Sequence, residues 1–165
     1  MRILTEIHVD ATPDACWEVL GCQFGDIAGW AAAILKSKVD REPEVGAKRE
    51  CTVRGLGGFG DMNLHEELIE YDEASRRLAY RVNSGLPKMI VAAENHWEVR
   101  ENSDGTSTIT SRAELRVAWY MAIMTPMMKV QMGRDIACVG EELKHRIERG
   151  VVHPRKSSAM QVAVA

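Results

Sequence analysis

The sequence predicts an α+β fold in which a curved antiparallel sheet of about six to seven strands wraps around one long C-terminal helix. Three observations support this prediction. Residues 2–9 alternate between two sets of side chains at the period of a strand. Residues 35–117 contain a series of further strand-like segments separated by turn residues. Residues 125–150 carry apolar side chains at spacings of four and three, the period of a helix.

A short helical region follows the first strand. Thr12 is a helix-capping residue type, and Pro13 suits the first helical position because its missing N–H is not needed there. Trp17 then belongs to the buried side of this helix. Residues 24–34, which include Trp30, predict a second short helix. Two helices therefore separate the first strand from the others.

The central part of the chain is expected to consist of six consecutive strands. Gly46 and the Asp104-Gly105 pair mark turns between them, and Asp-Gly is a strong hairpin signal. The expected element order is therefore β-α-α-β6-α. The six strand segments are residues 35–42, 47–54, 62–71, 77–83, 90–100 and 106–117.

The last predicted element begins at Thr125-Pro126, again a capping residue followed by proline. Its apolar stripe predicts a helix of about 23 residues that ends near Gly150. Residues 1–150 are therefore expected to form one domain with a single core. Residues 151–165 show no pattern and are expected to form a mobile tail.

Charge and hydropathy exclude several classes of protein. The chain has 165 residues, 24 acidic and 21 basic side chains and a formal charge of −3, so it lacks the basic excess of a nucleic-acid-binding protein. No apolar run is long enough for a secretory signal or a membrane-spanning helix. We therefore expect a cytoplasmic protein with no nucleic-acid partner and no stable membrane insertion.

Neither a metal nor a nucleotide cofactor is predicted. The four cysteines, at positions 16, 22, 51 and 138, form no C-x-x-C pair and are expected to be reduced packing residues. Residues 55–60 match G-x-G-x-x-G. That fingerprint requires a helix to follow, and here a strand is expected, so dinucleotide binding is rejected.

The predicted architecture leaves room for an internal cavity. One helix is only about 10–12 Å wide, which is less than the concave face of such a sheet. Large aromatic side chains could fill the remainder, or it could stay open for a small ligand. The chain has only two Phe and three Tyr, which favours an open cavity.

Several motifs together resemble the polyketide cyclase/dehydrase branch of the START-like (SRPBCC) superfamily. They are Val45-Gly46-Ala47 with Arg49, the run from Glu66 to Asp72, and the run from Arg77 to Val82. The resemblance covers residues 3–148. It implies a helix-grip fold that binds hydrophobic molecules such as lipids, polyketides or quinones, as carrier, receptor or cyclase/dehydratase. It also implies that Arg49 and Glu66 face the pocket.

Glu66 and His96 are the candidate catalytic residues, for acid/base-assisted cyclisation or dehydration. The alternative for Glu66 is a structural ion pair with Arg49 across neighbouring strands. The alternative for His96 is a position on the solvent face, because strict alternation places it opposite Trp97. Either alternative would remove the residue from the chemistry of the pocket.

The expected ligand-binding surface combines polar and apolar side chains. Tyr80 would offer a hydroxyl group, and flexible methionines suit adaptable apolar walls, although core packing is the alternative for both. Two loops are expected to gate the pocket or simply to connect strands. The ligand-binding candidates are Arg49, Met62, Leu64, Tyr80, Val82, Met128 and Met132, and the gate candidates are Phe59, Leu86 and Pro87.

The apolar segment 117–128 before the last helix is expected to be partly exposed. Through Trp119 and Tyr120 it could form a homodimer contact, a lid or a membrane contact. The leading functional hypothesis is a pocket for a small hydrophobic or aromatic molecule, with or without acid/base chemistry. The alternative is a non-catalytic lipid or quinone carrier, or a module that regulates a partner.

Overall fold

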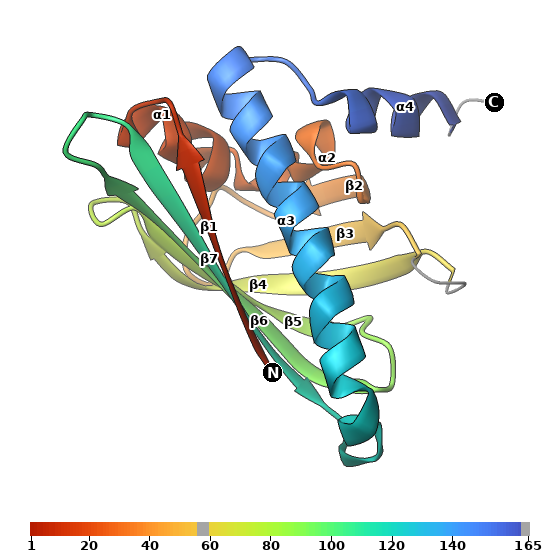
Figure 1. Cartoon of the computed structure of the whole chain (residues 1–165). Helices are drawn as coiled ribbons and strands as arrows, with labels where there is room; N and C mark the ends of the chain where they lie inside the picture. Colours follow the sequence, from red (N-terminus) through yellow and green to blue (C-terminus); the bar gives the residue numbers. More distant parts are fainter. Residues whose placement is uncertain (56–59, 163–165) are drawn as a thin grey trace.

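The computed structural model describes the backbone of residues 1–55 and 60–162 and the side chains of these residues as far as Ala159. A seven-stranded sheet curves around the long helix α3 (Thr125–Arg149), as Figure 1 shows. The predicted fold class is therefore confirmed. The strands are β1 (Arg2–Val9), β2 (Ile34–Val39), β3 (Lys48–Val53), β4 (Met62–Asp72), β5 (Arg77–Ser84), β6 (Ile90–Glu101) and β7 (Ser107–Val117).

All pairings in the sheet are antiparallel, and the strand order is β1-β7-β6-β5-β4-β3-β2. The last strand, β7, thus lies between the first strand and β6. Irregular register between Leu68 and Glu70 of β4, and between Ile90 and Ala92 of β6, marks bulges in two long strands. Bulges increase local twist and bend, which suits a sheet that curves around a helix.

Helix α3 crosses the concave face and packs most closely against β1. A Cβ at position 140 would lie 2.9 Å from the Cδ1 atom of Ile7, so a larger residue there would force the Ile7 side chain to move. Leu143, one turn further along, is fully buried in the main core. Gly150 ends the helix with a φ of 67°, a conformation that glycine adopts readily.

Short helices close one end of the concave face. They are α1 (Pro13–Trp17), the π-helical turn η1 (Glu18–Cys22), the 3₁₀ turn η2 (Phe24–Asp26) and α2 (Ile27–Trp30). Thr12 caps α1 by accepting a hydrogen bond from the Ala15 N–H, as predicted. The helix expected over residues 24–34 is shorter than predicted, because the chain leaves the helical conformation after Trp30 and β2 begins at Ile34.

Aromatic side chains fill most of the space beneath these short helices. Trp17, Phe24, Trp30 and Trp97 are all buried in the main core, and Tyr80 packs against it. The cavity that remains among Phe24, Trp30, Tyr80, Trp97 and their neighbours has a volume of about 20 Å³. The low number of Phe and Tyr residues thus does not leave an open cavity here, because three tryptophans fill the space.

The C-terminal segment contains regular structure that the sequence analysis did not predict. Residues Pro154–Val162 form helix α4, which lies at the same end of the molecule as α2 (Figure 1). Lys156 of α4 is only 4% exposed and donates a hydrogen bond of 2.8 Å to the carbonyl of Ile34. The segment expected to be a mobile tail thus contains a helix with long-range contacts to β2 and α3, and its mobility stays a prediction.

Candidate functional site

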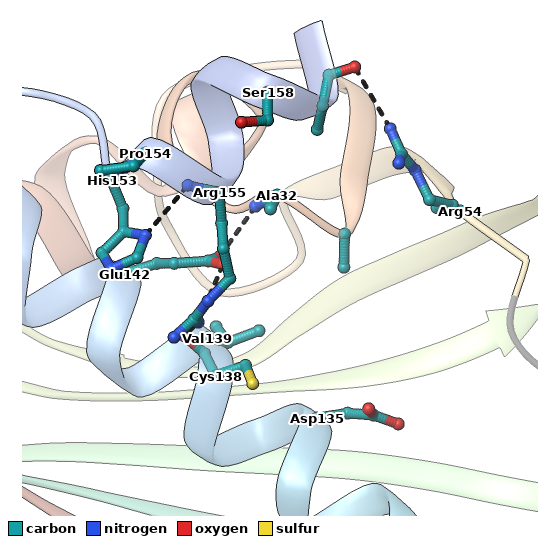
Figure 2. A pocket seen from close by; sticks show the side chains of 12 residues that line it. Ala32, Arg54, Asp135, Cys138, Val139, Glu142, His153, Pro154, Arg155 and Ser158 are labelled. Carbon is teal, nitrogen blue, oxygen red and sulfur yellow. Dashed lines mark hydrogen bonds and ion pairs between the residues drawn. The ribbon is translucent and has the colours of Figure 1, made fainter. Parts of the chain in front are cut away.

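A pocket of about 650 Å³ lies between α3, α4, the α2–β2 connection and the end of β3. Most of its lining is apolar, and the small side chains of Ala32 and Ala33 leave the space open. Figure 2 shows the charged and sulfur-containing side chains around it. The lining residues are Ala32, Ala33, Arg54, Asp135, Cys138, Val139, Glu142, His153, Pro154, Arg155, Ser158 and Ala159.

Glu142 of α3 organises one wall of this pocket. Its carboxylate accepts a hydrogen bond of 2.8 Å from the Ala32 N–H and one of 3.3 Å from Nη1 of Arg155. The side chain is only 3% exposed. A buried carboxylate is stable only when it is paired. Glu142 therefore connects α3 to the start of β2 and to α4, and both of its oxygens already have partners.

Arg155 of α4 joins the same wall. Its guanidinium also donates to the Cys138 carbonyl at 3.2 Å and forms an ion pair with Glu141. The hydrogen bond to Glu141 raises the pKa of Arg155 above its usual value. Nδ1 of His153 accepts a hydrogen bond from the backbone N–H of Arg155. The His153 ring packs edge-on against the His145 ring, with 5.0 Å between the ring centres. These contacts fix α4 against α3.

Two further charged groups lie on other sides of the pocket. Arg54, just after β3, donates a hydrogen bond of 3.4 Å to the Ala159 carbonyl of α4 and so approaches from the sheet side (Figure 2). Asp135 of α3 accepts a hydrogen bond from Gln131 on its own helix. The pocket thus has an apolar body with acidic and basic groups at its margins.

The predicted pair Arg49–Glu66 lies elsewhere, inside the core. Nε and Nη2 of Arg49 each lie 2.7 Å from Oε2 of Glu66, and Nη1 donates to the Phe24 carbonyl. The guanidinium lies 3.8 Å from the centre of the Phe24 ring and 5.0 Å from that of Tyr80. Burial alone would lower the pKa of Arg49, but the Glu66 carboxylate outweighs it, so the net pKa is raised and the group stays charged.

Tyr80, whose ring lies beside the Arg49 guanidinium, begins a separate group of hydrogen bonds on the concave face. Tyr80 accepts from the Asn95 amide at 3.3 Å, and Ser111 donates to the Asn95 oxygen at 3.1 Å. Burial raises the pKa of Tyr80, so its hydroxyl stays protonated near neutral pH. Tyr80 therefore faces inward as predicted, but its hydroxyl already has a protein partner.

His96 lies on the opposite face of the sheet from Glu66. Trp97 and Val99 of the same strand are buried in the core, and His96 alternates with them. Its Nε2 atom lies 3.8 Å from Glu94, which forms an ion pair with Arg81 on the outer face. The structure therefore does not bring the two predicted catalytic residues into one site, and their catalytic roles stay predictions.

The remaining candidates fall into three groups. Met62, Leu64 and Val82 are half-buried, and their strand positions share the face of Glu66. Met128 and Met132 lie on α3, and Met132 packs against Ile3, Ala113 and Leu115. Neither cavity described above is lined by any of these five residues. Leu86 and Pro87 lie in the β5–β6 loop near the start of α3, and Phe59 lies outside the described residues.

None of the residues that line the large pocket was predicted from the sequence to be a binding residue. One signal was present: Glu142 lies directly beside Leu143 and one turn from Val139 in the apolar stripe of α3. An acidic residue at the margin of a buried stripe requires a partner. The partner here is Arg155, and finding it required the position of α4.

The described part of the chain contains no cluster of three or more His, Cys, Asp or Glu side chains arranged to hold a metal ion. None of the helices within residues 1–55 and 60–162 is both long enough and apolar enough to cross a membrane.

Comparisons with solved structures show the same fold in distant proteins. A START superfamily protein from Mycobacterium smegmatis superimposes with a TM-score of 0.74 at 13% identity, over 91% of this chain and 99% of that one. A Thermus thermophilus protein gives 0.74 at 11% identity, over 89% and 97% of the two chains. A norcoclaurine synthase point mutant from Thalictrum, in complex with a transition-state analogue, gives 0.70 at 18%, over 89% and 93%.

Sequence comparison identifies the family. A search of curated proteins found no significant match. The family model described as "Polyketide cyclase / dehydrase and lipid transport" matches residues 2–148, nearly the whole domain. The chain therefore belongs to the polyketide cyclase/dehydrase and lipid transport family of START-like proteins.

Proposed function

We propose that this protein binds a small, largely apolar molecule in the pocket between α3 and α4. The observation that carries the proposal is the pocket volume of about 650 Å³, which falls within the range of small-molecule sites. Ala32, Ala33, Val139 and Ala159 provide apolar contact area. Membership of a family described by cyclase, dehydrase and lipid transport supports a hydrophobic ligand.

The polar groups of the pocket favour a ligand with one acceptor or anionic group. Glu142 already accepts hydrogen bonds with both oxygens, and Arg155 already has acidic partners. The Arg54 guanidinium has several donors and lies at the sheet side of the pocket. We infer that Arg54 binds the polar end of the ligand while the alanines and Val139 contact its apolar body.

Binding without chemistry is the activity that the geometry favours. Glu66 and His96, the predicted acid/base pair, lie on opposite faces of the sheet and outside the pocket. A carrier of a lipid or quinone would need only the pocket. The alternative, a cyclase or dehydratase that uses Glu66 and His96, predicts that Glu66→Gln or His96→Ala lowers turnover of the bound molecule and leaves its affinity unchanged. The cytoplasmic location stays a prediction, which fractionation of the host would test.

The first experiment is native mass spectrometry of the protein purified from its own host, followed by denaturing extraction. A stoichiometric apolar molecule is the expected result. In parallel, the emptied protein is titrated with 1-anilinonaphthalene-8-sulfonate, which combines an aromatic body with an anionic group. We expect Arg54→Gln to weaken this probe by about tenfold, the usual effect of losing one charge-assisted hydrogen bond.

Matched controls separate the pocket from nonspecific binding. Ala159→Phe fills the pocket and should abolish binding of the probe, whereas Ala137→Phe, on the exposed side of α3, should not. Arg41→Gln removes an equal charge from the exposed β2–β3 connection and should leave the affinity unchanged. An empty protein from the host, together with equal probe affinity in Ala159→Phe and Ala137→Phe, would refute the proposal.

A further inference from the structure

A cluster of exposed apolar side chains lies at the end of the molecule where α3 begins. We call it the apolar tip, and it is formed by Trp119, Tyr120, Ile123, Met124, Met127 and Val130. It belongs to the 3₁₀ helix η3 (Trp119–Met124) and the first turns of α3. Trp119 is 87% exposed and Ile123 is 91% exposed, which is unusual for large apolar side chains grouped on a soluble domain.

The backbone beneath the apolar tip is tied to the sheet. The Ala118 N–H donates to the Met89 carbonyl at 2.9 Å, so η3 starts beside the β5–β6 loop. The Tyr120 hydroxyl lies 3.5 Å from the Lys88 carbonyl, and the Trp119 and Tyr120 rings meet edge-on at 6.0 Å. The exposed side chains therefore project from a fixed platform at the lower end of Figure 1, far from α4 at the upper end.

The charged residues of the two chain segments that form and border the apolar tip are all positive. Residues 84–93 and 116–134 contain no Asp or Glu, and their four basic residues, Lys88, Arg116, Lys129 and Arg134, are exposed. Since the whole chain carries −3, the rest of the molecule carries −7. The tip is thus a cationic apolar region on an acidic protein.

This charge distribution favours one of the possible binding partners of the apolar tip over the others. A second copy docked tip to tip would bring like charges together and gain nothing from them. The tip is also a protruding surface, whereas a groove would suit a partner helix. Trp and Tyr beside aliphatic side chains, surrounded by Lys and Arg, match the interface of an anionic bilayer, where aromatic rings lie at headgroup level and cations contact anionic lipids.

We propose that the apolar tip docks the protein onto the surface of an anionic lipid bilayer. Trp119, Ile123 and Met127 enter the interfacial region, and Lys88 and Lys129 contact anionic headgroups. The attachment is peripheral and reversible, since one small apolar patch and a few cations provide modest affinity. The inference does not depend on the α3–α4 pocket: Thr125, where α3 begins, is about 15 Å along the helix from Asp135, the nearest lining residue.

Vesicle flotation tests the proposal with the full chain. Vesicles of phosphatidylcholine alone are compared with vesicles that also contain phosphatidylserine. Ile123→Ser with Met127→Ser removes apolar contact, and Lys88→Gln with Lys129→Gln removes charge. The matched controls, Leu4→Ser with Val45→Ser and Lys36→Gln with Lys38→Gln, make the same changes at exposed sites on the sheet and its connections. All the substituted side chains are exposed, so folding should be unaffected.

We expect binding to the phosphatidylserine vesicles and little binding to phosphatidylcholine alone. Each lysine removed should weaken binding about fivefold, and raising the salt from about 0.05 M to about 0.5 M should also weaken it. The Ile123→Ser, Met127→Ser protein should bind at least about tenfold more weakly. Fluorescence offers a second readout: Trp17, Trp30 and Trp97 are buried, so a blue shift on vesicle binding reports Trp119.

Three results would overturn the proposal. The first is no flotation with either vesicle. The second is flotation that the tip variants and the controls share equally. The third is a stable dimer, seen by size exclusion with light scattering, that Ile123→Ser with Met127→Ser dissociates, since this would assign the tip to a second copy. Ala159→Phe should float like the unmodified protein, so failure of the pocket proposal would leave this result unchanged.

Discussion

Removing the Glu66 carboxylate would leave the Arg49 guanidinium charged and unpaired inside the core. Arg49 is 3% exposed and makes two contacts of 2.7 Å with one oxygen of Glu66. Glu66→Ala deletes both contacts, and only the Phe24 carbonyl and the two aromatic rings remain as partners. Breaking a buried ion pair from one side costs about 3–5 kcal/mol. We therefore expect the free energy of unfolding to fall by about 4 kcal/mol.

Urea denaturation followed by tryptophan fluorescence would measure this loss. With an m value of about 2 kcal/mol/M, the midpoint should fall by about 2 M. Replacing both partners, Arg49→Met with Glu66→Leu, should restore most of the stability, because no buried charge is left unpaired. Glu50→Ala, on β3 next to Arg49, is the control: the Glu50 side chain is 68% exposed beside His65, so the change should be below about 0.5 kcal/mol.

A small effect would refute this reasoning. If Glu66→Ala costs less than about 1 kcal/mol, the pair does not hold β3 to β4. The same conclusion follows if the double variant is less stable than either single variant. A stabilising role would also explain why Arg49 and Glu66 lie outside the α3–α4 pocket, although the resemblance to START-like proteins implied that they face a ligand.

Three further measurements test other parts of the structure. Burial raises the pKa of the Cys51 thiol to about 11, so this thiol should not react with Ellman's reagent near pH 8 in the folded protein, whereas the exposed Cys138 should. Burial, together with the nearby Cys22 thiol and the carboxylates, raises the pKa of Tyr71 from 10.0 to about 12. Because the folded state holds this proton more tightly than the unfolded state, the free energy of unfolding should fall as the pH rises from 10.0 to about 12. Absorbance of the tyrosinate at alkaline pH should show the late titration. Gly85→Ala would place a Cβ 1.9 Å from a carbonyl oxygen of β4 at a φ of 90°. Its loss of stability in thermal unfolding should be well over the roughly 1 kcal/mol expected for Gly46→Ala, because Gly46 has a similar φ but open space around it. Equal losses in the two variants would contradict the steric argument.

The sheet and α3 were predictable because their signals are local. Alternation of apolar side chains identifies a strand within a few residues, and the spacing of Val139, Leu143 and Ile147 identifies the buried face of α3. Alternation also places Arg49, Glu66 and Trp97 on the inner faces of their strands, and the structure adds the register that pairs Arg49 with Glu66. These features depend on which face of a strand or helix a residue occupies, and the periodicity of apolar residues indicates that face directly.

Helix α4 and the large pocket were not predictable from such signals. The α4 sequence has no apolar stripe, and its position depends on Lys156, which contacts Ile34, and on Arg155, which contacts Glu142, more than ten residues away along the chain. Burial lowers the pKa of Lys156, which shows that its site is less favourable to charge than water. Contacts of this kind emerge only when distant segments are placed in space.

The proposed pocket and the apolar tip occupy different parts of α3, and the buried pair Arg49–Glu66 lies on the sheet. Its middle, near Glu142, lines the pocket that α4 borders, and its start, at Met127, carries the apolar tip. The polar residues Arg49, Glu66, Tyr80, Asn95 and Ser111 lie on strands β3 to β7. Because these three sets of residues have no member in common, substitutions in one should leave the others intact, and their effects should be nearly additive. The proposed pocket and the proposed membrane surface can therefore be tested separately in the same folded protein.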